Sequence, residues 1–187
     1  MKSLRLLLCA LPLALTGCST LSSINWSAAY PWNWFGSSLE VTEQGVGNIT
    51  AATALDQDAL QAALSSDYRL RSGMKTENGT IVRYFEALKG DKLALVINGD
   101  KGTVNRIAVL DDAIPTASGV KVGTPFSDLY KQAFGNCASA PSDDGVAVQC
   151  KAPDSQHISY LFTGTWSGPE GLMPSDDTLK NWKVSKI

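Results

Sequence analysis

The segment from residue 67 to residue 111 alternates extended stretches with short turn signals, and this pattern leaves few folds open. The stretches are DYRLRSGMKT, TIVRYFEAL, KLALVIN and TVNRIAVLD. Asn78-Gly79 is the strongest two-residue hairpin signal in the chain, and Gly90-Asp91 and GDKG at 99–102 are further turns. Because turns this short join antiparallel neighbours, the sequence predicts an antiparallel meander of about four strands.

A short amphipathic helix is predicted just before this meander, over residues 55–66 (LDQDALQAALSS). Leu60, Ala63 and Leu64 share one helical face, which is the spacing expected of a helix packed on a sheet. Thr53 is the predicted N-cap, because its hydroxyl can accept a hydrogen bond from a free amide of the first turn.

A second helix is predicted in GVKVGTPFSDLYKQAF, which begins at Gly119, with Thr124 as the N-cap and Pro125 at the first helical position. The stretches GVAVQCKA and HISYLFTGTW are predicted strands. Near the C-terminus Ser175 is expected to cap a further short helix, and Trp182 to pack back onto the domain.

The fold class that follows is α+β, with short helices packed on one face of one or more antiparallel sheets. GVGNITAATALDQDALQAAL and GVKVGTPFSDLYKQAF both run from Gly-Val through an extended step and a threonine into a helix. This likeness raises the hypothesis of two repeated helix-plus-meander units. We expect one α+β domain over residues 43–187, with lobes at 43–112 and 119–187 if the chain is duplicated.

The N-terminus has the pattern of a secretory signal. A basic start, MKSLR, precedes ten apolar residues, LLLCALPLAL, which are too few to span a bilayer that needs roughly 20. The sequence LTGC that follows resembles a bacterial lipobox, so residues 1–17 are predicted to be a lipoprotein signal peptide and Cys18 the lipidated residue. The alternative is an ordinary cleaved signal with a chance cysteine.

Residues 18–42 are predicted to be a lipidated, aromatic-rich tether, with Ser19 directly after the lipidated cysteine. In the sorting rule of such lipoproteins, serine rather than aspartate at this place directs the protein to the outer membrane. Aromatic side chains favour the membrane–water interface, so they could lie against lipid, or instead dock on the domain itself. The candidate interface residues are Trp26, Trp32, Trp34 and Phe35.

Two cysteines remain after the signal and the anchor are set aside, Cys137 and Cys150. In an oxidising compartment they can form a disulfide, and a zinc site is less favoured because no further Cys or His stands at zinc-ligand spacing. The chain holds 16 basic and 18 acidic residues, and loses Lys2 and Arg5 with the signal, which leaves 14 against 18. An acidic balance argues against a nucleic-acid partner.

No constellation of residues predicts an enzyme. His157 is the single histidine, and no nucleophile-elbow, phosphate-loop or dinucleotide motif occurs. Acid pairs stand at 111–112, 143–144 and 176–177, each beside turn residues or a helix start, where aspartate is favoured structurally. We therefore expect no catalytic residues, no cofactor and no metal. The alternative is a weak carboxylate-dependent hydrolase acting on peptidoglycan or another glycan.

Five strings carry a resemblance that covers essentially the whole chain: PWNWFGSS, DYRLRSGMKT, GTPFSDLY, SQHISY and GPEGLMPSDDTLKNWKVSKI. With the lipobox, they resemble the sigma-E-regulated lipoprotein family of Gram-negative bacteria, a family of unknown function. The resemblance implies an outer-membrane, periplasm-facing lipoprotein made under envelope stress, and it carries over no catalytic residue. We expect a non-enzymatic binding or structural module, with the membrane and an envelope protein or glycan as partners.

Overall fold

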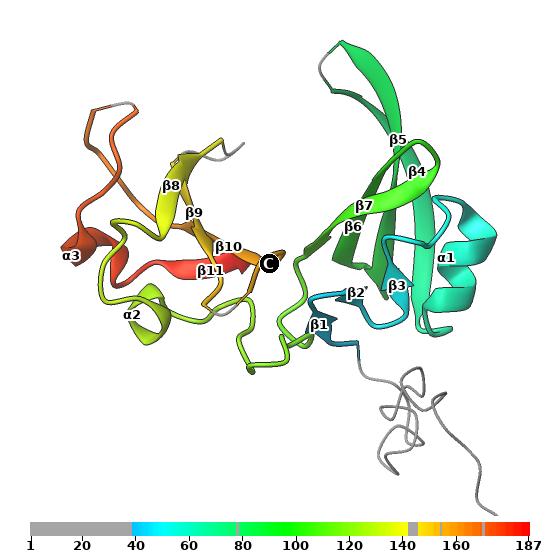
Figure 1. The fold of residues 1–187 in the computed structure, drawn as a ribbon, viewed down its shortest axis with the longest axis horizontal. Coiled ribbons are helices and arrows are strands. Elements are labelled where there is room, and N and C mark those ends of the chain that lie inside the picture. The colour runs from blue at the N-terminus through cyan, green and yellow to red at the C-terminus, as the bar shows by residue number, and fades with distance from the viewer. Residues whose placement is uncertain (1–38, 78, 142–145, 154, 170) are drawn as a thin grey trace, which may run out of the picture. The chain divides into compact units, whose positions relative to one another are not determined.

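The computed structural model describes residues 39–187, except 78, 142–145, 154 and 170. The predicted meander is present as a four-stranded antiparallel sheet in the order of the chain (Figure 1). Its strands are β4 (Tyr68–Glu77), β5 (Thr80–Lys89), β6 (Lys92–Asp100) and β7 (Thr103–Val109).

A second four-stranded sheet has the order β11-β10-β9-β8, and all of its pairings are antiparallel. Its strands are β8 (Cys137–Ala140), β9 (Ala147–Lys151), β10 (Ser159–Thr163) and β11 (Lys183–Lys186). The strands predicted in GVAVQCKA and HISYLFTGTW are thus β9 and β10.

Three short strands near the start of the described chain form a small antiparallel sheet. They are β1 (Val41–Thr42), β2 (Gly45–Val46) and β3 (Ile49–Thr50). The core begins before residue 43, because Leu39 and Val41 are both buried in it. Strands of two residues are too short to show a side-chain period, so these strands were not predicted.

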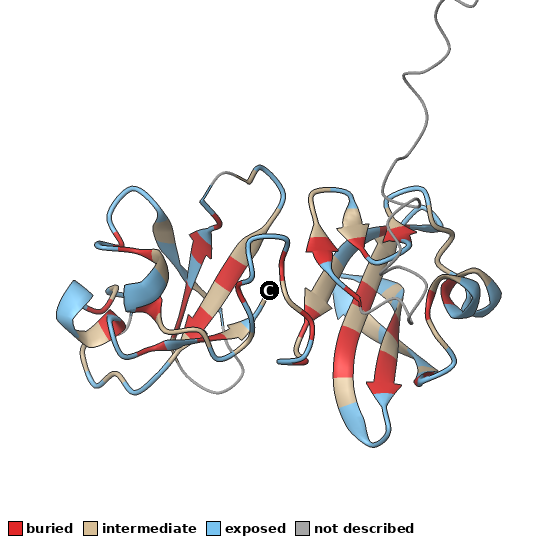
Figure 2. Cartoon of the chain, turned by 90° about the horizontal axis from the view of Figure 1, so that it is seen from below, coloured by how far each residue is buried: buried red, intermediate tan, exposed pale blue. Residues whose placement is uncertain are grey.

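Three short helices complete the described fold: α1 (Gln57–Ala63), α2 (Phe126–Leu129) and α3 (Asp176–Leu179). The architecture is therefore mostly antiparallel sheet with a few short helices. Figure 2 shows the buried residues concentrated on the strands of both large sheets and the exposed ones on turns and helix surfaces. The described residues form one compact unit, and Ile187 exchanges two backbone hydrogen bonds with Val109 of β7, at 2.8 and 3.1 Å.

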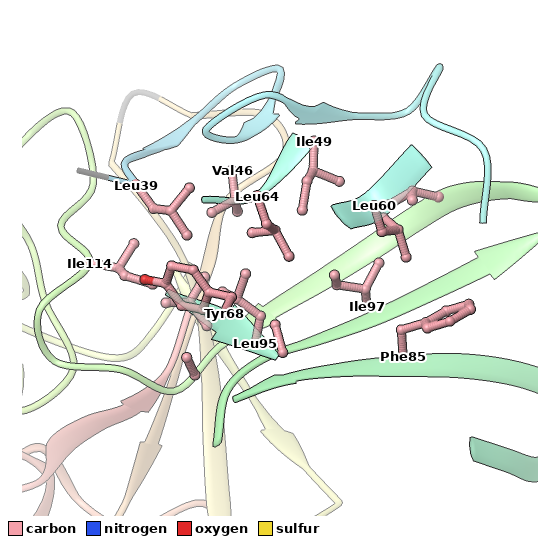
Figure 3. Packing of buried hydrophobic residues seen from close by; sticks show 14 of the residues in the cluster. Leu39, Val46, Ile49, Leu60, Leu64, Tyr68, Phe85, Leu95, Ile97 and Ile114 are labelled. Carbon is pink, nitrogen blue, oxygen red and sulfur yellow. The ribbon is translucent and has the colours of Figure 1, made fainter. Parts of the chain in front are cut away.

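The first core lies between α1 and the sheet of β4 to β7. Leu60 of α1 and Leu64 at its C-cap face Leu95 and Ile97 of β6, with Phe85 of β5 beside them (Figure 3). Leu60, Leu95 and Ile97 are fully buried. Leu60 and Leu64 of the predicted apolar face are buried, and burial of such side chains is what holds a seven-residue helix in place.

The N-cap of α1 is not the predicted Thr53. The helix begins at Gln57 and its N-cap is Asp56, whose carboxylate accepts a 2.8 Å hydrogen bond from the amide of Ala59. The hydroxyl of Thr53 instead accepts from the amide of Thr50 at 2.9 Å and closes the turn after β3. Both side chains accept a hydrogen bond from a backbone amide, Asp56 in the first turn of α1 and Thr53 in the turn after β3.

The second helix also begins later than predicted and ends earlier. Pro125 is the N-cap of α2, and the hydroxyl of Thr124 accepts from the amide of Lys121 in the preceding turn. The helix stops after Leu129 because Tyr130 is extended, with φ −135°. At Tyr130 tertiary contacts override the helical pattern.

The second core is centred on aromatic rings. Phe126 contacts Tyr130 and Phe162 at centroid distances of 5.2 Å each, and Tyr130 lies 6.0 Å from Phe162. The edge-on geometry of the two pairs with Phe162 is a favourable arrangement for aromatic quadrupoles. Trp182 is buried in the same core, as the sequence predicts, but the chain after it forms the unpredicted strand β11.

Gly164 allows the indole of Trp182 to lie on the backbone that follows β10. A Cβ added at Gly164 would lie 2.4 Å from the indole ring, and the ring is buried. We expect Gly164→Ala to lower the free energy of unfolding by about 1–3 kcal/mol, as overpacking does. Urea denaturation measures this, with the exposed neighbour Thr165→Ala as the control. Unchanged stability of Gly164→Ala would contradict this packing.

Candidate functional site

The hairpin of β4 and β5 extends past the rest of its sheet. Its ten residue pairs run without a register shift from Tyr68–Lys89 to Glu77–Thr80. Pairing of β5 with β6 starts only at Tyr84, so residues 80–83 pair with β4 alone. Figure 1 shows the two strands continuing beyond β6 and β7. This projecting hairpin is the candidate functional site.

The outer edge of β4 carries backbone groups that face away from β5. Glu77 and Thr80 flank a two-residue turn and therefore form a hydrogen-bonded pair, after which bonded and non-bonded pairs alternate. The amides and carbonyls of Leu70, Ser72, Met74 and Thr76 thus face outward. Tyr68 lies at an even-numbered position like these four residues, and its backbone also points away from β5. Its amide donates to the carbonyl of Ser65, and its carbonyl accepts from the side chain of Gln61.

The two faces of the hairpin differ in chemistry. One face carries Met74 and Ile81, diagonal neighbours that are 72% and 70% exposed, with Arg83 of β5 directly opposite Met74. The other carries the basic side chains of β4, namely Arg69, Arg71 and Lys75. The whole hairpin holds five basic and two acidic residues, for a net charge of +3 within a chain of net charge −2.

Two contacts on the basic face hold the strands of the hairpin together. The Nε of Arg71 donates to the carboxylate of Glu86 at 2.7 Å, directly across the pair. The ring of Tyr84 covers Gly73, since a Cβ added there would lie 2.5 Å from the ring. An aromatic ring over a strand glycine compensates for the packing that glycine lacks, so the hairpin is held together where it leaves the sheet.

A solvent-open depression of about 540 Å³ lies in the second half of the chain, beside α2 and the end of β9. Lys131 and Lys151 line it, together with Pro153 and Ser155 on either side of a residue outside the described part of the chain. The hydroxyl of Tyr130, at its side, donates to the carbonyl of Lys151. The tyrosine hydroxyl therefore serves the fold, and the two lysines are exposed.

The predicted site residues fall into two groups. Cys137 and Cys150 are joined by a disulfide and stand directly opposite each other on β8 and β9. Cys18, the tether and its aromatic residues Trp26, Trp32, Trp34 and Phe35 lie outside the described residues. The strand β8, which the disulfide ties to the sheet, was not predicted from the sequence.

His157 is an exposed residue in the bend before β10, and its backbone amide donates to the hydroxyl of Ser155 at 3.2 Å. Glu43 lies beside this bend, where its carboxylate accepts from the amide of Gln156 at 3.4 Å. A hydrogen bond from Ser155, assisted by the amide of Gln156, lowers the pKa of Glu43. No nucleophile is assembled with His157 among the described residues.

The acid pairs make separate structural contacts. Asp111 is buried and accepts from the amide of Ala113, and Asp176 accepts from the amide of Ala133 at 2.7 Å. Asp143 and Asp144 lie outside the described residues. Within the described part of the chain there is no cluster of three or more metal-ligating side chains. None of the helices described is long and apolar enough to cross a bilayer.

The described residues form a small sheet-rich domain with an exposed basic hairpin. The family described as "Protein of unknown function (DUF1131)" matches residues 23–187, and the chain belongs to it.

The chain is similar to the YfeY protein of Escherichia coli, both in sequence and in solved structure. The chain is 71% identical over 187 residues to the "Uncharacterized protein YfeY" of strain K12, covering 100% of this chain and 98% of that one. The crystal structure of YfeY matches with a TM-score of 0.72 at 65% identity, over 79% of this chain and 96% of that one. The fold is therefore shared with a solved structure.

Removal of the disulfide is expected to destabilise the protein. Cys137 and Cys150 are 13 residues apart, and loss of a loop closure of this length costs about 3 kcal/mol of stability. The measurement is urea unfolding of the wild type and of Cys137→Ala/Cys150→Ala, each with and without reductant. Reductant should affect only the wild type. Two alkylatable thiols in the native protein would contradict the bridge.

Tyr130 is expected to make stability fall at alkaline pH. Burial of the hydroxyl is the larger cause that raises the pKa of Tyr130 above the ordinary value of 10, and the nearby Tyr160 is the smaller one. The folded protein then holds a proton that the unfolded chain releases, so stability is complete below pH 10 and declines as pH rises further. Tyr68, whose pKa burial also raises, adds a slope of the same sign.

The variant Tyr130→Phe tests this dependence. At pH 7 it should lose about 1 kcal/mol of stability, because the carbonyl of Lys151 loses its donor. Above the ordinary tyrosine pKa it should lose stability less steeply than the wild type, so the two curves converge. Urea unfolding at several pH values measures both effects, and parallel curves would contradict the assignment.

Proposed function

We propose that this protein is an outer-membrane lipoprotein, anchored through Cys18 and facing the periplasm, that acts as a non-enzymatic binding module under sigma-E control of the envelope stress response. The lipobox-like LTGC and Ser19 support the anchor and its destination. Two or more acyl chains would hold the protein stably at a membrane, which one chain does only marginally.

The observation that carries the binding role is the projecting β4–β5 hairpin with its open edge. A hairpin that leaves its sheet gains no burial from doing so, and it exposes two apolar side chains and a row of backbone groups. Such an element is supported by the domain and available to a partner, which is an envelope protein or a glycan in this proposal.

Two finer parts of the proposal concern the rest of the chain. The tether aromatics Trp26, Trp32, Trp34 and Phe35 lie at the membrane interface near the anchor. The two halves arose by duplication of a helix followed by a four-stranded meander, which is supported by the order α1, β4 to β7 and the order α2, β8 to β11. In the second half α3 stands between the last two strands.

The anchor is tested with a pair of cysteine variants. Cys18→Ala should release the protein from the membrane fraction and abolish labelling by radioactive palmitate. Cys9→Ala is the matched control, because Cys9 lies in the apolar part of the signal and should leave anchoring unchanged. Fractionation of cells measures both. Membrane attachment that survives Cys18→Ala would overturn the anchor.

The non-enzymatic role is tested separately, by incubating the purified protein with isolated peptidoglycan sacculi and analysing the soluble products. No release above the background is expected. Release that a single Asp or Glu substitution abolishes would overturn this part of the proposal and establish a hydrolase.

A further inference from the structure

We propose that the outer edge of β4 binds an extended acidic segment of another polypeptide, which adds a fifth strand to the first sheet. This inference deepens the binding role proposed above and rests on it. Three observations carry it: the open backbone groups of β4, the cover on other sheet edges, and the charges that flank the open edge.

The backbone of β4 offers a regular ladder to an incoming strand. The outward amides and carbonyls of residues 70, 72, 74 and 76 recur every second residue, about 7 Å apart. No hydrogen bond to these groups is found within the described part of the chain. An extended peptide can pair with such groups through main-chain hydrogen bonds, as in β-strand addition.

Two other edges of the large sheets are covered. On β7 the amide of Val104 donates to Thr53 at 3.0 Å, and its last residue pairs with Ile187. On β11 Val184 exchanges hydrogen bonds with Gly123 and Thr124, at 2.7 and 2.9 Å. The short edge strand β8 is tied to its neighbour by the disulfide. β4 is longer than β8, has no bulge against β5 and contains no proline.

The charges of β4 decide which strand fits. Arg69, Arg71 and Lys75 lie on one face of β4, which also carries Gly73 and Glu77. Arg71 pairs with Glu86 of β5 and Lys75 with Glu77 at 3.6 Å, so this face keeps an excess of basic charge. Two antiparallel copies of β4 paired with Ser72 opposite Ser72 would place Arg69 opposite Lys75, which is unfavourable. A strand with Asp or Glu at alternate positions would instead meet opposite charges. The flexible side chain of Met74 lies on the other face of β4, where it can contact apolar residues that alternate with the acidic ones in the added strand.

An anionic membrane fits less well than a strand. The three basic side chains of β4 lie on the face opposite Met74 and Ile81, and Arg83 is the one basic side chain of residues 80–83 that shares the apolar face. A flat lipid surface can meet only one of these faces at a time. A strand added in the plane of the sheet contacts both faces together, because its own side chains alternate between them.

The binding test uses the full mature lipoprotein in non-ionic detergent and fluorescent ten-residue peptides. The probe alternates Glu and Val, a second peptide has the same composition in two blocks, and a third alternates Lys and Val. Fluorescence anisotropy should show binding of the alternating acidic peptide only. Equal binding of the block peptide, binding of the basic peptide or no binding at all would overturn the proposal.

Variants of the protein locate the binding. Ser72→Pro removes one outward amide and leaves the hydrogen bonds between β4 and β5 in place, because an edge strand tolerates proline where its amide faces outward. The variant should weaken binding of the acidic peptide about tenfold or more. Ser72→Thr keeps the amide and should bind as the wild type. Undiminished binding by a folded Ser72→Pro, checked by its circular dichroism, would refute the edge as the site.

Charge variants keep the test decisive if Ser72→Pro does not fold. Lys75→Glu should weaken binding of the acidic peptide several-fold, and less so at high salt, whereas Lys186→Glu, an exposed lysine of β11, should not. Equal effects of the two would overturn the proposal, as would binding confined to vesicles of phosphatidylglycerol. Membrane fractionation and the sacculus assay are independent of these readouts, so failure here is distinguishable from failure of the proposed function.

Discussion

The register of β4 against β5 is the constraint on which the first half of the molecule depends. Ten consecutive pairs place Phe85 and Ala87 in the core with α1 above them. A slip of one residue would move both to the opposite face and bring Tyr84 and Glu86 inside. The same register fixes which backbone groups of β4 point outward, so the core and the exposed edge are set together.

The meander could be predicted because its signals are local. Alternation of side chains and two-residue turns at 78–79 and 90–91 act within a few residues, and these decide strand pairing without reference to the rest of the chain. The helix face of Leu60 and Leu64 follows from the same kind of short-range period. The predicted pairing of Cys137 with Cys150 needed only the count of cysteines and their compartment.

The elements that could not be predicted depend on residues far apart in sequence. Tyr130 leaves the helical path, and its hydroxyl donates to the carbonyl of Lys151, 21 residues later. β11 contains only four residues and is a strand because it pairs with β10. The open edge of β4 could not be predicted either, since no local pattern tells which strand of a meander stays uncovered. Its alternate basic residues are the one signal that could have drawn attention to it.

The disulfide between β8 and β9 has a consequence for the timing of folding. Reducing compartments keep cysteines as thiols, so in such a compartment the four residues of β8 would depend on backbone pairing alone. In the exported lipoprotein proposed above, the C-terminal half would gain this covalent closure only after translocation, and the closure would then oppose its unfolding.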